Sequence, residues 1–194
     1  MTKQYTAMSL ADVIVEFDAI AHDAAAVFGQ LDERQLNWRP DPAKWSVAQC
    51  FDHLLNANRE MFQAIDAAIE PSASRTIWQR LPLLPRLFGR VMVRSQMPDA
   101  SQKFTAPATA VPAASAIEPD ITDRFIAHQR EAAAHVRAIE DRDVADTIMV
   151  SPFVSFITYS VLDGCRLIVT HERRHFEQAR RITQAPGFPS RSGA

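Results

Sequence analysis

The chain has 194 residues, which is enough for one domain with a sizeable core. Its 21 basic and 23 acidic side chains give a formal net charge of −2, so no basic field indicates a nucleic-acid partner. No stretch approaches the roughly 20 apolar residues of a membrane span, and the N-terminus lacks the apolar core of a signal peptide. With two cysteines and no disulfide framework, these features predict a cytoplasmic protein.

Residues 9–30 form the first predicted helix. Ser9 can accept a hydrogen bond as its N-cap, and Gly29 lies near its end. The following residues, 31–44, contain two prolines and are predicted to form an ordered loop. Apolar residues recur at helical spacing in the helix, and we expect this face to be buried: Val13, Phe17, Ile20, Ala24 and Phe28.

The second predicted helix begins at Ser46 and ends at Pro71. Ser46 and Gln49 have the spacing of a capping box, in which each side chain bonds the backbone N–H of the other residue. His53 lies about 150° from the apolar stripe of this helix, on a face of small residues. That face either contacts a neighbouring helix closely or is open to solvent. The stripe itself comprises Val47, Phe51, Leu54, Leu55, Phe62, Ile65 and Ile69.

Residues 72–118 are less regular. A short or broken helix is expected within residues 78–94, and residues 98–119 are predicted to be a long crossover strap that packs over something or frames a site. The arginines near the short helix alternate with apolar residues, which is typical of a lid with solvated arginines or of a surface that lies on an acidic membrane or partner. They could also meet an anionic substrate. These residues are Arg75, Arg80, Arg86, Arg90 and Arg94.

A third helix is predicted over residues 119–141 and a fourth over residues 160–184. Ser160, with Asp163 three residues later, has the pattern of an N-cap for the fourth. The buried face of the third helix should include Ile121, Phe125, Ala132, Val136 and Ile139.

Four long helices with one long crossover, between the second and the third, predict an all-α fold of the four-helix-bundle type. We expect a single domain over residues 1–185 and a disordered tail over residues 186–194.

His171 and His175 are four residues apart in the fourth helix, so their side chains lie on one face and can bind one metal ion. A third nitrogen would complete a site with positions open to water or substrate. On these residues alone, a surface helix with two spaced histidines is an equally good interpretation.

Glu172 and His128 are the candidate catalytic residues. Glu172 completes a His-Glu-x-x-His run, in which the glutamate of zinc proteases activates water, but the wider protease context is absent. It is otherwise an exposed residue or a hydrogen-bond partner of a ligand. His128 either lines the pocket and moves a proton, or is a hydrogen-bonded histidine at the edge of the core. Cys50 is expected to be a small buried residue rather than a nucleophile.

A metal-binding histidine usually donates its second ring N–H to an acceptor. The side chains that could serve are Gln49, Asp52, Asn56, Glu60, Asp163 and Gln178, and the sequence does not rank them.

The Trp-Ser-x-x-x-x-x-x-His-Leu run of residues 45–54, the later His-x-x-x-His run and the Lys-Phe-Thr-Ala-Pro strap of residues 103–107 resemble the DinB/YfiT-like metalloenzymes. The similarity covers nearly the whole chain. It implies a bundle in which His53, His171 and His175 bind one divalent ion, with zinc, nickel, iron and manganese all compatible. Members with an assigned activity are thiol S-transferases that use a low-molecular-weight thiol, or a thiol-dependent maleylpyruvate isomerase, and many others are described as hydrolases.

We therefore expect a metal-dependent enzyme that acts on a small molecule, with thiol transfer to an electrophile as the first hypothesis and metal-dependent hydrolysis as the second. A non-catalytic metal-binding or interaction module is the third, and a fourth protein ligand from His128 or Glu172 would favour it. A homodimer through helix faces is compatible with the resemblance.

Overall fold

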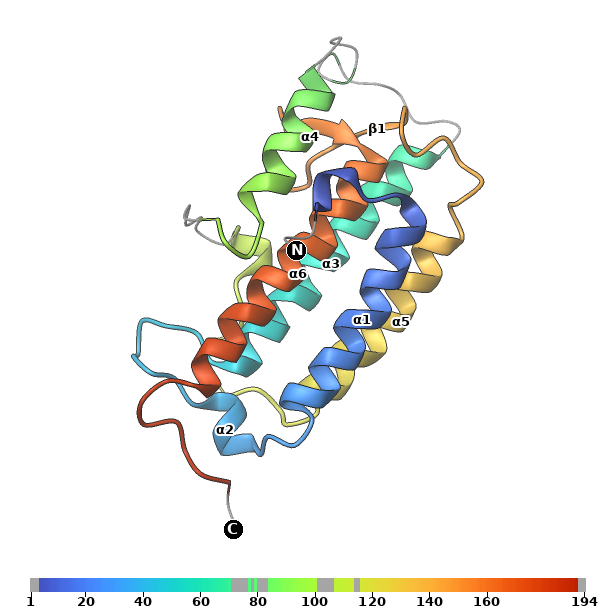
Figure 1. The fold of residues 1–194 in the computed structure, drawn as a ribbon. Helices are drawn as coiled ribbons and strands as arrows, with labels where there is room; N and C mark the ends of the chain where they lie inside the picture. Colours follow the sequence, from blue (N-terminus) through green and yellow to red (C-terminus); the bar gives the residue numbers. More distant parts are fainter. Residues whose placement is uncertain are drawn as a thin grey trace.

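The computed structural model describes residues 4–70, 77, 79, 84–100, 107–113 and 116–191. Four long helices run side by side along the molecule (Figure 1). They are α1 (Leu10–Phe28), α3 (Val47–Ile69), α5 (Ile121–Arg137) and α6 (Val161–Thr183).

The remaining elements of the described residues are short. They are the helices α2 (Glu33–Asn37) and α4 (Leu84–Ser95), the 3₁₀ turns η1 (Tyr5–Ala7) and η3 (Ala108–Ala110), and the strands β1 (Ile148–Val150) and β2 (Thr158–Ser160). The strands pair antiparallel, with Met149 opposite Tyr159. The predicted helical bundle is therefore confirmed, with one small hairpin added to it.

Side-chain caps define where three of the long helices begin. Ser9 and Ser46 each form a reciprocal capping box, Ser9 with Asp12 and Ser46 with Gln49. Ser160 accepts a hydrogen bond from the backbone N–H of Asp163 over 3.0 Å. The predicted caps are thus confirmed.

Two segments between the long helices contain short elements that the sequence did not predict. Residues 31–44 contain α2, because Asp32 and Gln35 form a capping box, with bonds of 2.9 Å and 3.1 Å, that starts a helix ahead of the two prolines. Residues 148–160 contain the hairpin, whose strands have only three residues each. The third predicted helix also ends early, at Arg137, since the next residues bond i to i−3 as turns.

The core contains an aromatic cluster with one ring from each long helix. Phe28 of α1 packs edge-on against Phe51 of α3 and Phe176 of α6, at 5.2 and 5.1 Å between centroids. Phe51 in turn stacks on Phe125 of α5 at 4.6 Å. The predicted apolar face of α1 is fully buried. This shared core fixes the rotation of α3 and α6 relative to each other.

That rotation decides between the two interpretations of the His53 face. His53 is 3% exposed and its neighbour Cys50 is fully buried, because α6 packs against this side of α3. The face of small residues is therefore a helix contact, and the solvent alternative is wrong.

Helix α4 lies beside α6 at the end of the bundle that carries the hairpin (Figure 1). Arg86, Arg90 and Arg94 are exposed, and Arg86 lies 3.6 Å from Asp146. The described part of the arginine-rich segment therefore has the arrangement expected of a lid with solvated arginines. Arg75, Trp78 and Arg80 lie outside the described residues, as do residues 103–106 of the strap.

Residues 186–191 run back along α2. Gly187 has a φ of +84°, which turns the chain so that Phe188 packs edge-on against Trp38 at 5.5 Å. Gln35 Nε2 donates to the carbonyl of Pro189 over 3.0 Å. The predicted disorder stays a prediction for residues 192–194, which lie outside the described residues. No helix in the described part of the chain is long and apolar enough to cross a membrane.

Candidate metal centre

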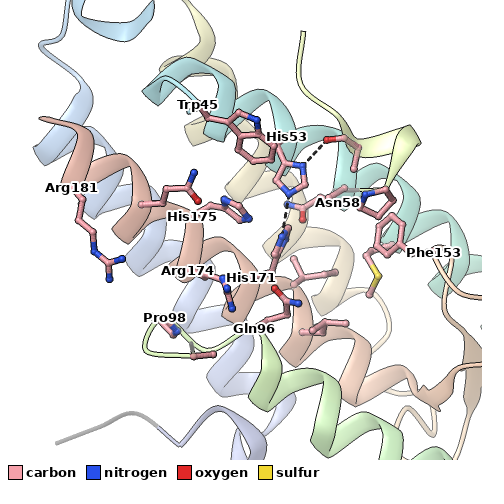
Figure 2. Close-up of a pocket in the computed structure, with 18 of the residues that line it drawn as sticks. Trp45, His53, Asn58, Gln96, Pro98, Phe153, His171, Arg174, His175 and Arg181 are labelled. Atoms are coloured by element: carbon pink, nitrogen blue, oxygen red, sulfur yellow. Dashed lines mark hydrogen bonds between the residues drawn. The ribbon is translucent and has the colours of Figure 1, made fainter. Parts of the chain in front are cut away.

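Three histidines from two helices converge in one place (Figure 2). His53 comes from α3, and His171 and His175 come from successive turns of α6. Their candidate ligand atoms all lie within 4.8 Å of one another, and His53 Nε2 lies 3.2 Å from His171 Nε2. The predicted grouping of these three residues is therefore present, and neither His128 nor Glu172 belongs to it.

The crossover strap orients His53. The Nδ1–H group of His53 donates to the carbonyl oxygen of Ala110 in η3 over 2.6 Å. This leaves the lone pair of His53 Nε2 directed at His171. Two residues of α3 hold the strap at Ala113: Gln49 Nε2 donates to its carbonyl and Asp52 Oδ2 accepts from its N–H, both over 2.9 Å. The strap thus frames the site, as its length suggests.

Trp45 forms a wall of the site. Its ring stacks on His175 with centroids 5.6 Å apart and lies 4.8 Å from the ring of His53. Sequence reasoning assigned Trp45 no role, although it directly precedes the N-cap Ser46 and is thereby tied to the start of α3. Two signals were available: this adjacency to a helix start, and the place of Trp45 at the head of the Trp-Ser-x-x-x-x-x-x-His-Leu run of residues 45–54.

Burial lowers the pKa of all three imidazoles. For His175 it lowers the pKa to about 3, with the charges of His53 and Arg174 as further causes. The pKa of His171 is held well below 6.5 by burial and by the neighbouring His175 and His53. The pKa of His53 is also lowered by burial, and its hydrogen bond to Ala110 offsets only part of that lowering. The rings are therefore neutral at neutral pH, which is the form that binds a metal.

One buried ring nitrogen has no hydrogen bond. His175 Nδ1 is buried without a hydrogen-bond partner, in a structure whose other buried polar atoms are almost all paired. Three neutral imidazoles and an unpaired ring nitrogen make a donor set that fits zinc, nickel or iron, all of which imidazole suits.

The histidines open into a cavity of about 990 Å³. Its walls come from α3 and the loop before it, from α4 and α6, from the strap and from the loop before β2. None of the described lining residues is an aspartate or a glutamate, whereas three carry positive charge: Lys44, Arg174 and Arg181. The apolar lining includes Met61, Met92, Phe153, Val154, Leu167 and Ile168.

Glu172 points away from this cavity. It is completely buried, so the expectation of an exposed residue is wrong. Its Oε1 accepts hydrogen bonds from Asn58 Nδ2 over 2.6 Å and from Gln129 Nε2 over 2.9 Å. Burial raises its pKa to about 7. Because Asn58 itself lines the cavity, Glu172 contributes by holding that amide in place.

His128 lies at the edge of the core, outside the cavity lining. Its Nε2 is 3.1 Å from Asn58 Nδ2, so it accepts from the same amide that Glu172 holds. Burial lowers its pKa, which keeps the ring neutral and able to accept. Cys50 is fully buried and burial raises the pKa of its thiol, so it supplies no thiolate.

Comparison with known proteins gives one family. The family model described as DinB superfamily matches residues 16–179, a range that includes all three histidines. No match was found among the curated proteins or among the solved structures.

Proposed function

The chain belongs to the DinB superfamily, and on that basis we propose that it is a metal-dependent enzyme that transfers a small thiol to an electrophilic substrate. In this proposal one divalent ion is held by His53, His171 and His175. The observation that carries it is the convergence of three neutral imidazoles on an open cavity that has no carboxylate among its described lining residues.

The missing carboxylate favours a thiol over water as the nucleophile. Water has a pKa near 15.7 and hydrolases commonly add a general base to the metal, whereas a free thiol has a pKa of about 8.5. Glu172, the base of the zinc-protease pattern, is buried on the other side of α6 and bonded to two amides. A bound divalent ion would supply the charge that lowers the pKa of a thiol at the site.

The transfer step balances without any other reagent. The sulfur electron pair forms the new C–S bond, the leaving group departs with the electrons of the bond that breaks, and the thiol proton passes to solvent. The hydrogen bond to Ala110 holds His53 in one tautomer. His53 therefore cannot exchange the thiol proton through Nδ1 without losing that bond. A cavity of about 990 Å³ has room for two small reactants, since it is at the upper end of the roughly 300–1,000 Å³ of pockets that hold one drug-sized ligand.

The first test is metal content by elemental mass spectrometry on wild type, His53→Ala, His171→Ala and His135→Ala. His135 is the matched control, because it bonds Asp66 over 2.8 Å and lies outside the group. We expect near-stoichiometric metal in wild type and in the control, and its loss in the other two variants. Wild type without metal after reconstitution at neutral pH overturns the proposal.

The second test is turnover by the metal-loaded protein. Cysteine and an aryl chloride should give a thioether and chloride with wild type and not with His171→Ala. A nitrophenyl ester supplied without thiol tests the hydrolase alternative. Ester cleavage without thioether formation would replace transfer by hydrolysis, and metal binding with neither reaction would identify a non-catalytic module.

A further inference from the structure

The positive charge of the cavity lies along α6 beyond the histidines. His171, Arg174, His175, Gln178 and Arg181 all line the cavity, at the spacing of one helix face (Figure 2). Since an α-helix rises 1.5 Å per residue, Arg181 lies about 9 Å along the axis from His175. A molecule that reaches the three imidazoles can therefore extend to Arg181 along one wall.

Arginines of α6 outside the cavity are paired with carboxylates. Arg173 bonds Glu16 over 2.7 Å and also bonds Asp23, and Arg180 bonds Glu177 over 2.7 Å. Arg166 bonds Asp163 over 2.8 Å in the same way. The protein thus neutralises these guanidinium groups within its own surface.

Arg181 differs from its neighbour Arg180 in this respect. Both are exposed on α6, yet no carboxylate among the described residues forms an ion pair with Arg181. Arg174 lies two helical turns before Arg181 on the same cavity wall, and its Nη1 donates to the backbone carbonyl of Ser95 over 2.7 Å. Arg174 and Arg181 therefore both present their positive charge to the same cavity.

Cations that share a cavity with no carboxylate among its described lining residues would be stabilised by an anion bound there. We propose that Arg174 and Arg181, with Lys44 at the mouth of the cavity, form a subsite for an oxyanion of the substrate, a carboxylate or a phosphate. Arginine suits this role because its planar guanidinium group can donate two parallel hydrogen bonds to such a group. Ser95 holds one of the two guanidinium groups in advance.

This subsite deepens the proposed function, since it rests on the same cavity being the substrate site. It predicts a substrate with an anionic end on the Arg174 and Arg181 side of the atom that reacts at the histidines. Oxyanion binding itself needs no metal, so it can be tested separately from turnover.

The test is titration of metal-free protein with inorganic phosphate and with acetate, at constant ionic strength, followed by the NMR resonances of arginine Nε–H groups. The variants are Arg181→Gln and the matched control Arg180→Gln, which removes the same charge one residue away. We expect saturable shifts in wild type and in the control. In Arg181→Gln we expect the affinity for the probe to be lower by a factor of about five or more. The stronger of the two probes assigns the class of oxyanion.

Equal affinities in Arg180→Gln and Arg181→Gln, or no saturable binding of either probe to wild type, would overturn the subsite. His53→Ala should bind the probe as wild type does while losing metal. If wild type binds the oxyanion but no metal, the result counts against the proposed function alone. If it binds metal but no oxyanion, the result counts against the subsite alone.

Discussion

His53 donates from Nδ1 to the carbonyl oxygen of Ala110 over 2.6 Å, although the two residues are 57 positions apart. The bond links a candidate metal ligand on α3 to the strap that crosses the bundle. Because the acceptor is a backbone atom, the orientation of the imidazole depends on where the strap runs. Asp52 and Gln49 set that course by bonding both sides of Ala113.

Replacing Asp52 should weaken metal binding without touching a ligand. Asp52→Ala removes the acceptor for the Ala113 N–H and also a charge that raises the pKa of His53. Since outer hydrogen-bond partners change metal affinity by about 10- to 100-fold and Asp52 acts through one further bond, we expect about a fivefold loss. Competition titration with Zn²⁺ and a chromophoric chelator measures it.

Asp66→Ala is the control, because Asp66 lies on the same helix but bonds His135. Its Zn²⁺ affinity should equal that of wild type. An unchanged affinity in Asp52→Ala would show that the strap does not orient His53.

Metal affinity should persist into mildly acidic solution. Protons compete with a metal only below the pKa of the free ligand, and burial holds the pKa of His53 below 6.5, that of His171 well below it and that of His175 at about 3. Zn²⁺ affinity measured at pH 7.5 and at pH 5.5 should therefore differ little. A steep fall below pH 6.5 would indicate histidines with ordinary pKa values.

The same lowered pKa values predict that the stability of the metal-free protein, unlike its metal affinity, depends on pH in this range. Unfolded histidines take up protons near pH 6.5 and the native ones do not, so the contribution of these three histidines to the free energy of unfolding should fall as pH falls from 6.5 towards 3. Urea unfolding followed by circular dichroism separates this effect from metal binding.

The sequence was sufficient for the parts of the fold that have local signals. Capping at Ser46 and Ser160 and the 3.6-residue apolar period give the starts and inner faces of the long helices. The i, i+4 spacing of His171 and His175 likewise needs only one helix. His53 required more, since its face was open to two interpretations until α6 was known to pack on it.

Other parts of the site have no local signal. Ala110 acts through a carbonyl group that every residue carries, so none of the six side chains considered as partners of a ligand is the acceptor for His53. Glu172 directly follows the candidate ligand His171, but whether its side chain meets solvent or α5 depends on the packing of three helices. The hairpin is too short for its alternation to be recognised.

Glu172 should make stability decrease with rising pH. Its pKa is about 7 in the folded protein and 4.5 when unfolded, so the native state binds more protons between these values. The stabilisation is complete below pH 4.5 and is lost as pH rises through 7, with a total of about 3 kcal/mol. Glu172→Gln keeps an acceptor for Asn58 and Gln129 and carries no charge.

Metal-free Glu172→Gln should therefore match wild type in urea unfolding at pH 5 and be more stable at pH 8. Glu172→Ala should be less stable at both values, since it leaves the Gln129 amide and one N–H of the Asn58 amide without their acceptor, at about 1–3 kcal/mol for such a group. A constant difference between Glu172→Gln and wild type across this range would show that Glu172 does not titrate there.

Gly89 should be required for α4 to close the cavity. A Cβ atom at Gly89 would clash with the carboxylate of Asp163, with Cγ only 2.8 Å away, and Asp163 is itself buried and bonded to Arg166. Gly89→Ala would normally favour a helix by about 1 kcal/mol, but here we expect a net loss of about 1–3 kcal/mol as α4 is pushed from α6.

Urea unfolding of Gly89→Ala measures that loss, with Arg90→Ala as control because Arg90 is exposed on the same helix. Asp163→Ala removes the carboxylate that the new methyl group would meet, so the cost of Gly89→Ala should be smaller in that background. Equal costs in the two backgrounds would mean that the glycine serves something other than the approach to Asp163. Since Met92, one turn along α4, lines the cavity, relief in the double variant would tie the position of this wall to the Gly89–Asp163 contact.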